Sequence, residues 1–452
     1  MLLVALSSFS LVSAKWREAV AENRRAEGNL SLALESMDQI LERFASGWMA
    51  HPSAIESDGE STASDVEFQI AVSDHSAEVL QDALRFYDQF AKQNATNSEL
   101  QRDTAKVHRR VADIYERLGQ YTKAEEAYKR SLVILDSEPI DDEAELAIER
   151  ASTLNQLGLT MYATSRFDEA KIEFLRAKET LSGDAISDEP RCRAELARIN
   201  NNLGQTLWLM RSREEAIQSH QRAVEILEDL VGQHPQDTDF RLALARAYRI
   251  YYPCVVFGKE KVDHEKIRSA GISILEKLVH DYPNVPDYQC ELSEMLTATS
   301  FCRRDARKRE EQARRLERAV ALAKGLTESH PSIPRYRAVL ARTLKELAQM
   351  HGKLDRGNAR DRYLESVSIY RSLAQDFADI PVYHMFLAMA LKDHGVNLRE
   401  MGRITESQIA IEEGISEQDA YVRLRPGSRF GRGMLARLHE ELAVTLSDRD
   451  AV

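Results

Sequence analysis

The sequence predicts an all-α fold in which antiparallel helix pairs stack into a right-handed superhelical solenoid. Two observations predict it: apolar residues recur at helical spacing, and small residues mark a register that repeats every 46 to 48 residues. Self-similarity at a fixed period over most of a chain is the sequence signature of a solenoid. A chain of 452 residues is also too long for one compact core, and a solenoid avoids that limit because each repeat contacts only its neighbours.

The clearest helix pair lies between Ala194 and Pro235. Its first helix has one apolar stripe with spacings of three and four, namely Leu196, Ile199, Leu203 and Leu207. A break follows at 210–212, and a second helix carries its own stripe, namely Ala216, Ala223, Ile226, Leu227 and Leu230. His234-Pro235 ends that helix, because proline disfavours the helical conformation in the residue before it. Neither helix can bury its stripe alone, so the pair requires neighbours.

Copies of this pair are found by following one small residue, which we call the register mark. The marks are Ala105, Ala151, Ala197, Ala245, Ser293, Ala341, Ala388 and Ala436. Seven intervals hold register within two residues, which a chance run of amphipathic helices would not do. We therefore expect seven helix pairs followed by one last helix.

The register divides the chain into five parts. They are an apolar segment at 1–14, N-terminal helices at 15–98 with an acidic loop at 49–77, three regular repeats at 99–235, four longer repeats at 236–431, and a capping helix at 432–452. In the fourth repeat we expect Pro253 to end the first helix early. In the capping helix we expect Leu435, Leu438, Leu442 and Val444 to face inward.

Within the copies, the order of residues resembles the tetratricopeptide repeat. The resemblance rests on Leu157-Gly158, Tyr162, Phe167, Ala170, Phe174 and Ala177, and on the matching set Tyr115, Gly119, Tyr121, Ala124 and Tyr128. The period exceeds the roughly 34 residues usual for this repeat. The long connector, His330 to Arg337 followed by Leu340-Ala341, resembles the C-terminal sensor half of large bacterial membrane-bound serine/threonine kinases. That resemblance implies a kinase domain and one membrane helix before the repeats, but this sequence contains no kinase motif.

Residues 1–14 have three interpretations. The segment MLLVALSSFSLVSA is apolar and uncharged, but shorter than the roughly 20 residues that span a bilayer. It can be the end of a membrane helix, which the kinase resemblance implies and which Lys15-Trp16-Arg17 favours, because basic and aromatic residues gather at membrane interfaces. It can also be a signal peptide without a basic start, or a segment packed on the first repeat.

Composition and motifs argue against catalysis and against general nucleic-acid binding. The formal net charge is −12, whereas a nucleic-acid binder requires a basic surface. The four cysteines show no zinc spacing, so we expect each to behave as a small buried apolar residue. The sequence has no phosphate-binding glycine loop and no H-E-x-x-H motif. We expect no catalytic residue, no cofactor and no metal.

The remaining candidate site is the surface of the first helices, which we expect to line the concave side of the solenoid. The resemblance implies inward positions with amide, arginine and aromatic side chains, which suit peptide backbones and carboxylates. The candidate partner-binding residues are Arg109, Asn155, Gln156, Tyr162, Arg198, Asn201, Asn202, Gln205 and Trp208. Asp113 stands where an amide would be expected and would repel a carboxylate. The alternative is that these residues only tie adjacent helices together.

The sequence therefore predicts a non-catalytic scaffold that binds a protein or peptide partner, is associated with a membrane through residues 1–14, and binds no nucleic acid. The alternative function is the sensor or regulatory half of a bacterial serine/threonine kinase signalling protein. A third class, an enzyme with an unrecognised site between the fourth and sixth repeats, has no motif in its favour. The alternative locations are an exported or a cytoplasmic soluble protein, and the oligomeric state is left open.

Overall fold

We describe the protein from a computed structural model of the 452-residue chain. The chain divides into two compact units, Met1–Met49 and Ala50–Val452. The described residues all belong to the second unit and are 56–58, 61–63, 101–117, 120–137, 143–182, 188–257, 263–298, 306–352, 356–378, 380–425 and 428–450. The apolar segment 1–14 and the N-terminal helices expected within 15–98 lie outside these residues.

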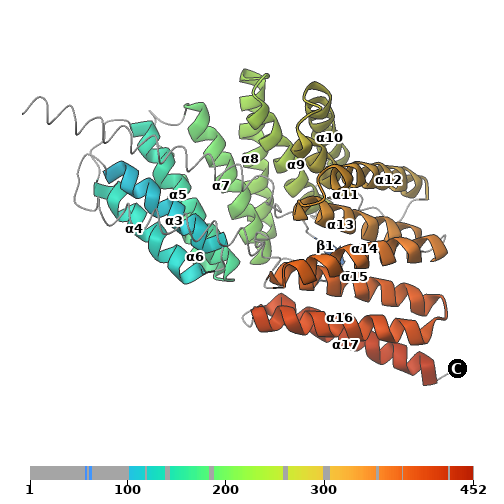
Figure 1. Ribbon diagram of the computed structural model, residues 1–452. Helices are drawn as coiled ribbons and strands as arrows, with labels where there is room; N and C mark the ends of the chain where they lie inside the picture. Colours follow the sequence, from blue (N-terminus) through green and yellow to red (C-terminus); the bar gives the residue numbers. More distant parts are fainter. Residues whose placement is uncertain are drawn as a thin grey trace, which may run out of the picture. The chain divides into compact units, whose positions relative to one another are not determined.

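The described part of the repeat region is a succession of α-helices in which neighbours along the chain pack as antiparallel pairs (Figure 1). The pairs are α3 (Gln101–Arg117) with α4 (Tyr121–Ser137), α5 (Glu143–Ala163) with α6 (Phe167–Thr180), α7 (Pro190–Leu209) with α8 (Arg213–Gln233), α9 (Thr238–Phe257) with α10 (His264–Asp281), α11 (Pro286–Ala298) with α12 (Ala306–Ser329), α13 (Pro334–His351) with α14 (Arg356–Asp376), and α15 (Pro381–Glu400) with α16 (Ile404–Leu424), followed by α17 (Arg429–Asp450). The all-α solenoid of helix pairs predicted from the register is confirmed.

The stretch expected to be an acidic loop, 49–77, contains a short hairpin. Strand β1 (Glu56–Asp58) pairs antiparallel with β2 (Ser61–Ala63), with Ser57 opposite Thr62. In the sequence, Gly59 and Glu60 separate the strands, and a two-residue connection that begins with glycine is typical of tight hairpins. The acidic composition did not indicate this pairing. The rest of 49–77 lies outside the described residues, so the loop expectation stays a prediction.

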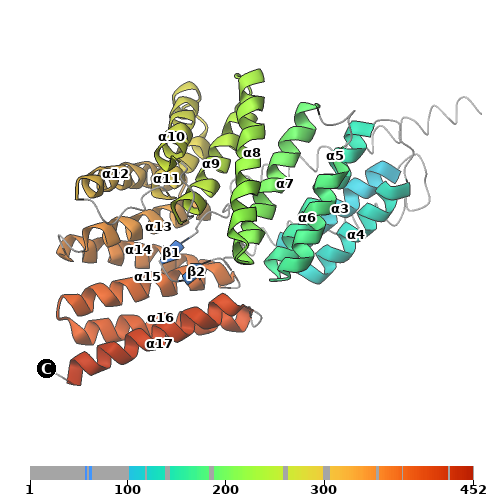
Figure 2. The same cartoon turned by 180° about the vertical axis from the view of Figure 1, so that it is seen from behind.

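The helices form two layers. Each odd-numbered helix from α3 to α15 packs on the even-numbered helix that follows it, and α5, α7, α9, α11 and α15 also contact the next odd-numbered helix along the chain. Figure 2 shows the same succession from behind. We call the odd-numbered helices the first-helix layer. Side chains on the flank of one first helix can therefore contact the first helix of the next repeat.

The reference pair, α7 and α8, shows why the sequence folds this way locally. The Glu189 carboxylate accepts a hydrogen bond from the Cys192 backbone N–H at 2.8 Å, and Pro190 occupies the first turn, where its missing N–H costs nothing. Arg211 adopts a φ of 64° in the tight turn between the helices. A Cβ on Gly204 would approach the His220 ring to within 2.7 Å, so only glycine lets the two backbones lie this close.

The connectors between successive pairs share an aromatic contact. In four connectors, the residue directly after the second helix packs its ring against an aromatic residue near the start of the next first helix. These connector pairs are His234–Phe240 at 5.8 Å between ring centroids, Tyr282–Tyr288 at 6.1 Å, His330–Tyr336 at 5.8 Å and Phe377–Tyr383 at 5.8 Å. Aromatic pairs at this separation favour tilted or edge-to-face geometry, which holds each turn in one conformation.

The expectation that Pro253 ends its helix early is wrong, because α9 continues through it to Phe257. Proline inside a helix costs about 3 kcal/mol, since it removes one backbone hydrogen bond and its ring crowds the preceding turn. The surrounding side chains offset that cost: Tyr251, Tyr252 and Cys254 are all buried. Tertiary burial therefore outweighs the local preference here.

Of the four residues expected to face inward in the last helix, α17, Leu438 is buried, Leu435 and Leu442 are half-buried, and only Val444 is exposed. Phe430, Met434, Leu438 and Thr445 are buried, whereas Val444 is 47% exposed. Leu438 and Thr445 are two turns apart and share a face, and Val444 is rotated away from that face by one residue. The helix begins at Arg429, three residues before the expected start of the capping helix at residue 432.

Candidate functional site

The predicted partner-binding residues lie on three successive first helices, α3, α5 and α7. Their exposure differs. Arg198 is exposed, five are half-buried, namely Arg109, Gln156, Tyr162, Asn202 and Gln205, and three are buried, namely Asn155, Asn201 and Trp208. The structure therefore leaves part of the predicted surface accessible and closes the rest.

Two of the polar side chains join α5 to α7. The Asn202 amide donates to Asn155 Oδ1 at 2.9 Å, and Arg198 donates to Ser152 Oγ at 3.0 Å. Arg198 also donates to the Glu195 carboxylate one turn before it, at 2.7 and 2.8 Å. These contacts match the alternative interpretation, in which the residues tie adjacent helices together.

Each of the two aromatic candidate residues packs against a side chain of its own repeat. The Tyr162 ring stands edge-on to Phe167 at 5.7 Å between centroids. The guanidinium of Arg213 lies over the Trp208 ring at 5.6 Å, and Trp208 keeps 9% of its surface exposed. The Trp208 side chain is thus mainly a packing group whose edge borders the surface.

His220 of α8 is fully buried and contacts Asn201, one of the predicted partner-binding residues. Its Nδ1 lies 3.2 Å from Asn201 Oδ1, and a carbonyl oxygen can only accept, so Nδ1 carries the proton. Its Nε2 has no hydrogen-bond partner in the described part of the chain. Burial lowers the pKa of His220 to about 3. The ring is therefore neutral near pH 7.

This burial predicts an acid-sensitive stability. A histidine in the unfolded chain has a pKa near 6.5, so between roughly pH 6.5 and pH 3 the unfolded state binds more protons than the folded state. The contribution of the neutral His220 to the free energy of unfolding should therefore be fully present above about pH 6.5. It should be lost as the pH is lowered toward 3. We expect the urea midpoint to fall less steeply between pH 7 and pH 4 in His220→Leu than in the parent. The exposed His439→Leu serves as control, and equal slopes in the parent and His220→Leu would contradict the assignment.

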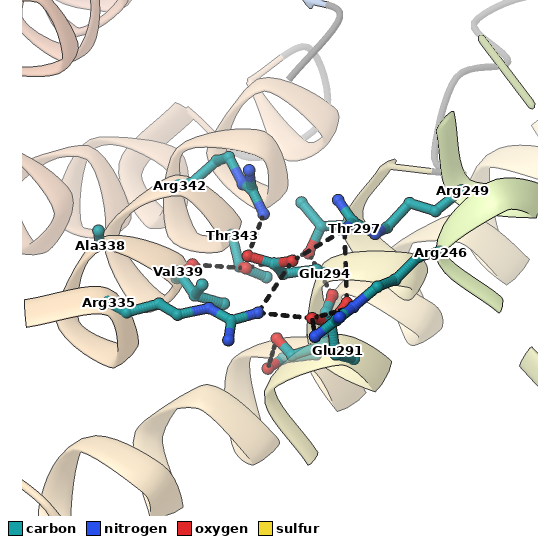
Figure 3. Close-up of polar contacts among 12 residues, drawn as sticks. Arg246, Arg249, Glu291, Glu294, Thr297, Arg335, Ala338, Val339, Arg342 and Thr343 are labelled. Carbon is teal, nitrogen blue, oxygen red and sulfur yellow. Dashed lines mark hydrogen bonds and ion pairs between the residues drawn. The ribbon is translucent and has the colours of Figure 1, made fainter. Parts of the chain in front are cut away.

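A second cluster on the first-helix layer was missed by the sequence analysis. Arginines from α9 and α13 converge on two glutamates of α11 (Figure 3). We call it the arginine–glutamate cluster, consisting of Arg246, Arg249, Glu291, Glu294, Arg335 and Arg342.

Glu291 is the centre of this cluster. Its carboxylate lies 2.8 Å from Arg246, 3.3 Å from Arg249 and 2.7 Å from Arg335, and its side chain is 1% exposed. Glu294 lies 3.5 Å from Arg249 on one side and 3.5 Å from Arg342 on the other. The two glutamates thus connect three consecutive first helices.

The cluster is held in a desolvated environment. Burial lowers the pKa of Arg249, and the neighbouring Glu294 and Glu291 oppose that shift. Arginine nevertheless stays charged in proteins, so each buried guanidinium requires a counter-charge. Only Arg246, with 31% of its side chain exposed, reaches the surface appreciably. The arrangement is suited to joining repeats rather than to chemistry.

A sequence signal for this cluster existed. Arg198 follows its register mark by one residue, and Arg246, Glu294 and Arg342 stand at the same position in the next three repeats. The sequence analysis counted inward positions only on α3, α5 and α7. Extending the count by three repeats would have placed these charged residues side by side.

Comparison with known proteins identifies the repeat. The sequence profiles of the tetratricopeptide repeat match residues 105–132 and 196–237. These two segments of the chain are similar to the tetratricopeptide repeat. No curated protein sequence matches the chain.

Solved structures of low sequence identity match parts of the chain with TM-scores below 0.5. The apo form of RapI is 13% identical, with 71% of this chain and 99% of that chain covered and a TM-score of 0.46. A tetratricopeptide repeat protein from Parabacteroides merdae is 9% identical, covering 76% and 98%, with a TM-score of 0.38. BtubC from P. vanneervenii is 15% identical, covering 67% and 91%, with a TM-score of 0.35.

The described residues offer neither a metal site nor a membrane span. They hold no group of three or more His, Cys, Asp or Glu residues placed to share a metal ion. No helix in this part of the chain combines the length and apolarity needed to cross a bilayer. Cys192, Cys254 and Cys290 are buried, as expected from the sequence, while Cys302 lies outside the described residues.

Proposed function

We propose that this protein is a non-catalytic scaffold that binds an extended peptide segment of a partner along the first-helix layer at α5 and α7. The observation that carries the proposal is the accessible polar edge beside the Asn155–Asn202 pair, where Arg198 is exposed and Gln205 is half-buried. Tetratricopeptide repeats generally serve as protein-interaction surfaces, which supports this assignment.

The chemistry of that edge suits a peptide main chain. A glutamine amide both donates and accepts, so Gln205 can pair with a backbone N–H and a backbone C=O. Arg198 offers a charged donor for a carboxylate or carbonyl. Asn155 Nδ2 is buried and has no hydrogen-bond partner in the described part of the chain, so one more donor is present behind the surface. The half-buried Tyr162 supplies an apolar face with a polar tip.

The site is pre-formed, because its side chains stand on packed helices rather than on loops. A surface that is ordered before binding loses little conformational entropy when the partner arrives. The Asn202–Asn155 bond and the Arg198–Ser152 bond fix the spacing of α5 and α7. In this view, the contacts that tie the helices together also hold the binding edge in place.

The membrane association of this scaffold is part of the proposal. The apolar segment 1–14 followed by Lys15-Trp16-Arg17 supports attachment at the N-terminal side, with an exported or cytoplasmic soluble protein as the alternative. A role as the sensor half of a kinase signalling protein is the second candidate. It is favoured by the connector that ends in Tyr336 and Arg337, whose His330 stacks on Tyr336.

A peptide-display selection tests the binding proposal. The full chain is immobilised, peptides are selected from a random library, and the affinity of a selected peptide is measured by fluorescence anisotropy. We expect Gln205→Ala and Arg198→Ala each to raise the Kd about tenfold, the scale of one lost charge-assisted or buried hydrogen bond. The control is Arg130→Ala on α4, whose side chain is 67% exposed.

The helical circular dichroism of each variant is recorded beside its affinity, so that unfolding is not mistaken for lost binding. The proposal would be overturned if a selected peptide binds Gln205→Ala and Arg198→Ala as tightly as the parent but binds the Arg130→Ala control more weakly.

A further inference from the structure

Arg425 directly follows α16, and at this connector the aromatic pattern of the four preceding connectors is broken. The residues at the same place in four earlier connectors are His234, Tyr282, His330 and Phe377, each stacked on the next first helix. An arginine cannot make that ring pair, although the aromatic that would receive it, Phe430, is present at the start of α17.

The Arg425 side chain instead contacts the other end of the repeat array. Its Nη2 donates to the Tyr121 hydroxyl at 2.6 Å, and its guanidinium carbon lies 4.9 Å from the centroid of the Tyr121 ring. Tyr121 is the first residue of α4, so this contact joins residues 304 positions apart in the sequence.

A second atom of the same side chain points at the end of α5. Arg425 Nη1 lies 3.5 Å from the carbonyl oxygen of Ala163, the last residue of that helix. The last four carbonyls of a helix have no partner within the helix and carry its negative dipole end, which attracts a cation. One guanidinium thus contacts two helices of the first two repeats.

We propose that Arg425 is a clasp that holds the last connector against α4 and α5, and so limits how far the repeats between them can spread apart. Two independent observations support it: the contact itself, and the loss of the connector aromatic at the one residue that makes the contact. A solenoid otherwise has contacts only between neighbouring repeats, so its ends move by the sum of many small displacements. The clasp does not depend on the identity of any partner.

The clasp is tested by measuring a distance across it in the full chain. Spin labels are attached to Glu126→Cys on α4 and Ser416→Cys on α16, both exposed positions, in a chain with Cys302→Ser; the cysteines Cys192, Cys254 and Cys290 are buried. Pulsed electron paramagnetic resonance then gives the distribution of label separations. We expect one narrow distribution in the doubly labelled chain.

Substitution at the contact should broaden that distribution toward longer separations. We expect Arg425→Ala to reduce the short-separation population roughly fivefold, the scale of a partly exposed cation–π contact with a charge-assisted hydrogen bond. Tyr121→Phe keeps the ring and loses the hydroxyl, so it should fall between the parent and Arg425→Ala. Arg423→Ala, two residues away and exposed, is the matched control.

Unchanged helicity in each variant shows that the repeats remain folded. A distribution that is already broad in the parent, or one that is the same in Arg425→Ala and Arg423→Ala, would overturn the clasp. Neither result bears on peptide binding at α5 and α7, so failure of the clasp is distinguishable from failure of the proposed function.

Discussion

Glu291→Ala is expected to destabilise the chain by about 3–5 kcal/mol, the cost of breaking a buried ion pair by removing one partner. The Glu291 carboxylate is shared by Arg246, Arg249 and Arg335, so its removal leaves buried guanidinium groups without their nearest counter-charge. The effect should be local, since a repeat array can lose cooperativity at one junction. Hydrogen exchange in α9, α11 and α13 should therefore rise more than in α15 and α16.

The control for this prediction is an exposed ion pair on the second helices. Glu276 lies 2.5 Å from Arg318, with 43% and 49% of the two side chains exposed. Exposed pairs of this kind contribute at most about 1 kcal/mol, so Glu276→Ala should shift the urea midpoint little. Equal shifts for Glu291→Ala and Glu276→Ala would show that the arginine–glutamate cluster does not join the repeats.

Phe174→Ala is the second large effect, with an expected loss of about 3–5 kcal/mol. The Phe174 ring is fully buried in α6 and lies against Gly158 of α5, where a Cβ would come within 2.7 Å of the ring. Removing the ring opens a cavity at the point where the two backbones are closest. The free energy of unfolding from urea titration measures the loss.

A double substitution sharpens this prediction. Gly158→Ala alone should destabilise by about 1–3 kcal/mol, because its methyl group collides with the Phe174 ring. In the Phe174→Ala background the ring is gone, so Gly158→Ala should no longer destabilise. Additive losses in the double variant would contradict the close contact between α5 and α6.

The sequence was sufficient to predict the repeat architecture because the register depends on small buried residues. The register marks from Ala105 to Ala388 are buried, as close packing of each helix pair requires. Ala436 on α17 is exposed in the described part of the chain. The pattern thus predicted the packing of the marks up to Ala388, but not that of Ala436.

The features that the sequence analysis missed depend on contacts between repeats. The residues around Pro253 are buried by tertiary packing. Helix propensity describes only the local chain, so it did not predict that α9 continues through the proline. The arginine–glutamate cluster requires a comparison of three helices at once. The role of Asn202 was left between two alternatives, and its bond to Asn155 now shows the helix-joining contact. Peptide binding at the same edge stays a proposal.

Peptide binding along the first-helix layer is tested by a hydrogen-exchange footprint of the full chain with a selected peptide bound. If the partner lies on the first-helix layer, protection should appear in α5 and α7, and the second helices α6 and α8 should exchange as in the free chain. Protection confined to α6 and α8, with α5 and α7 unchanged, would contradict the account.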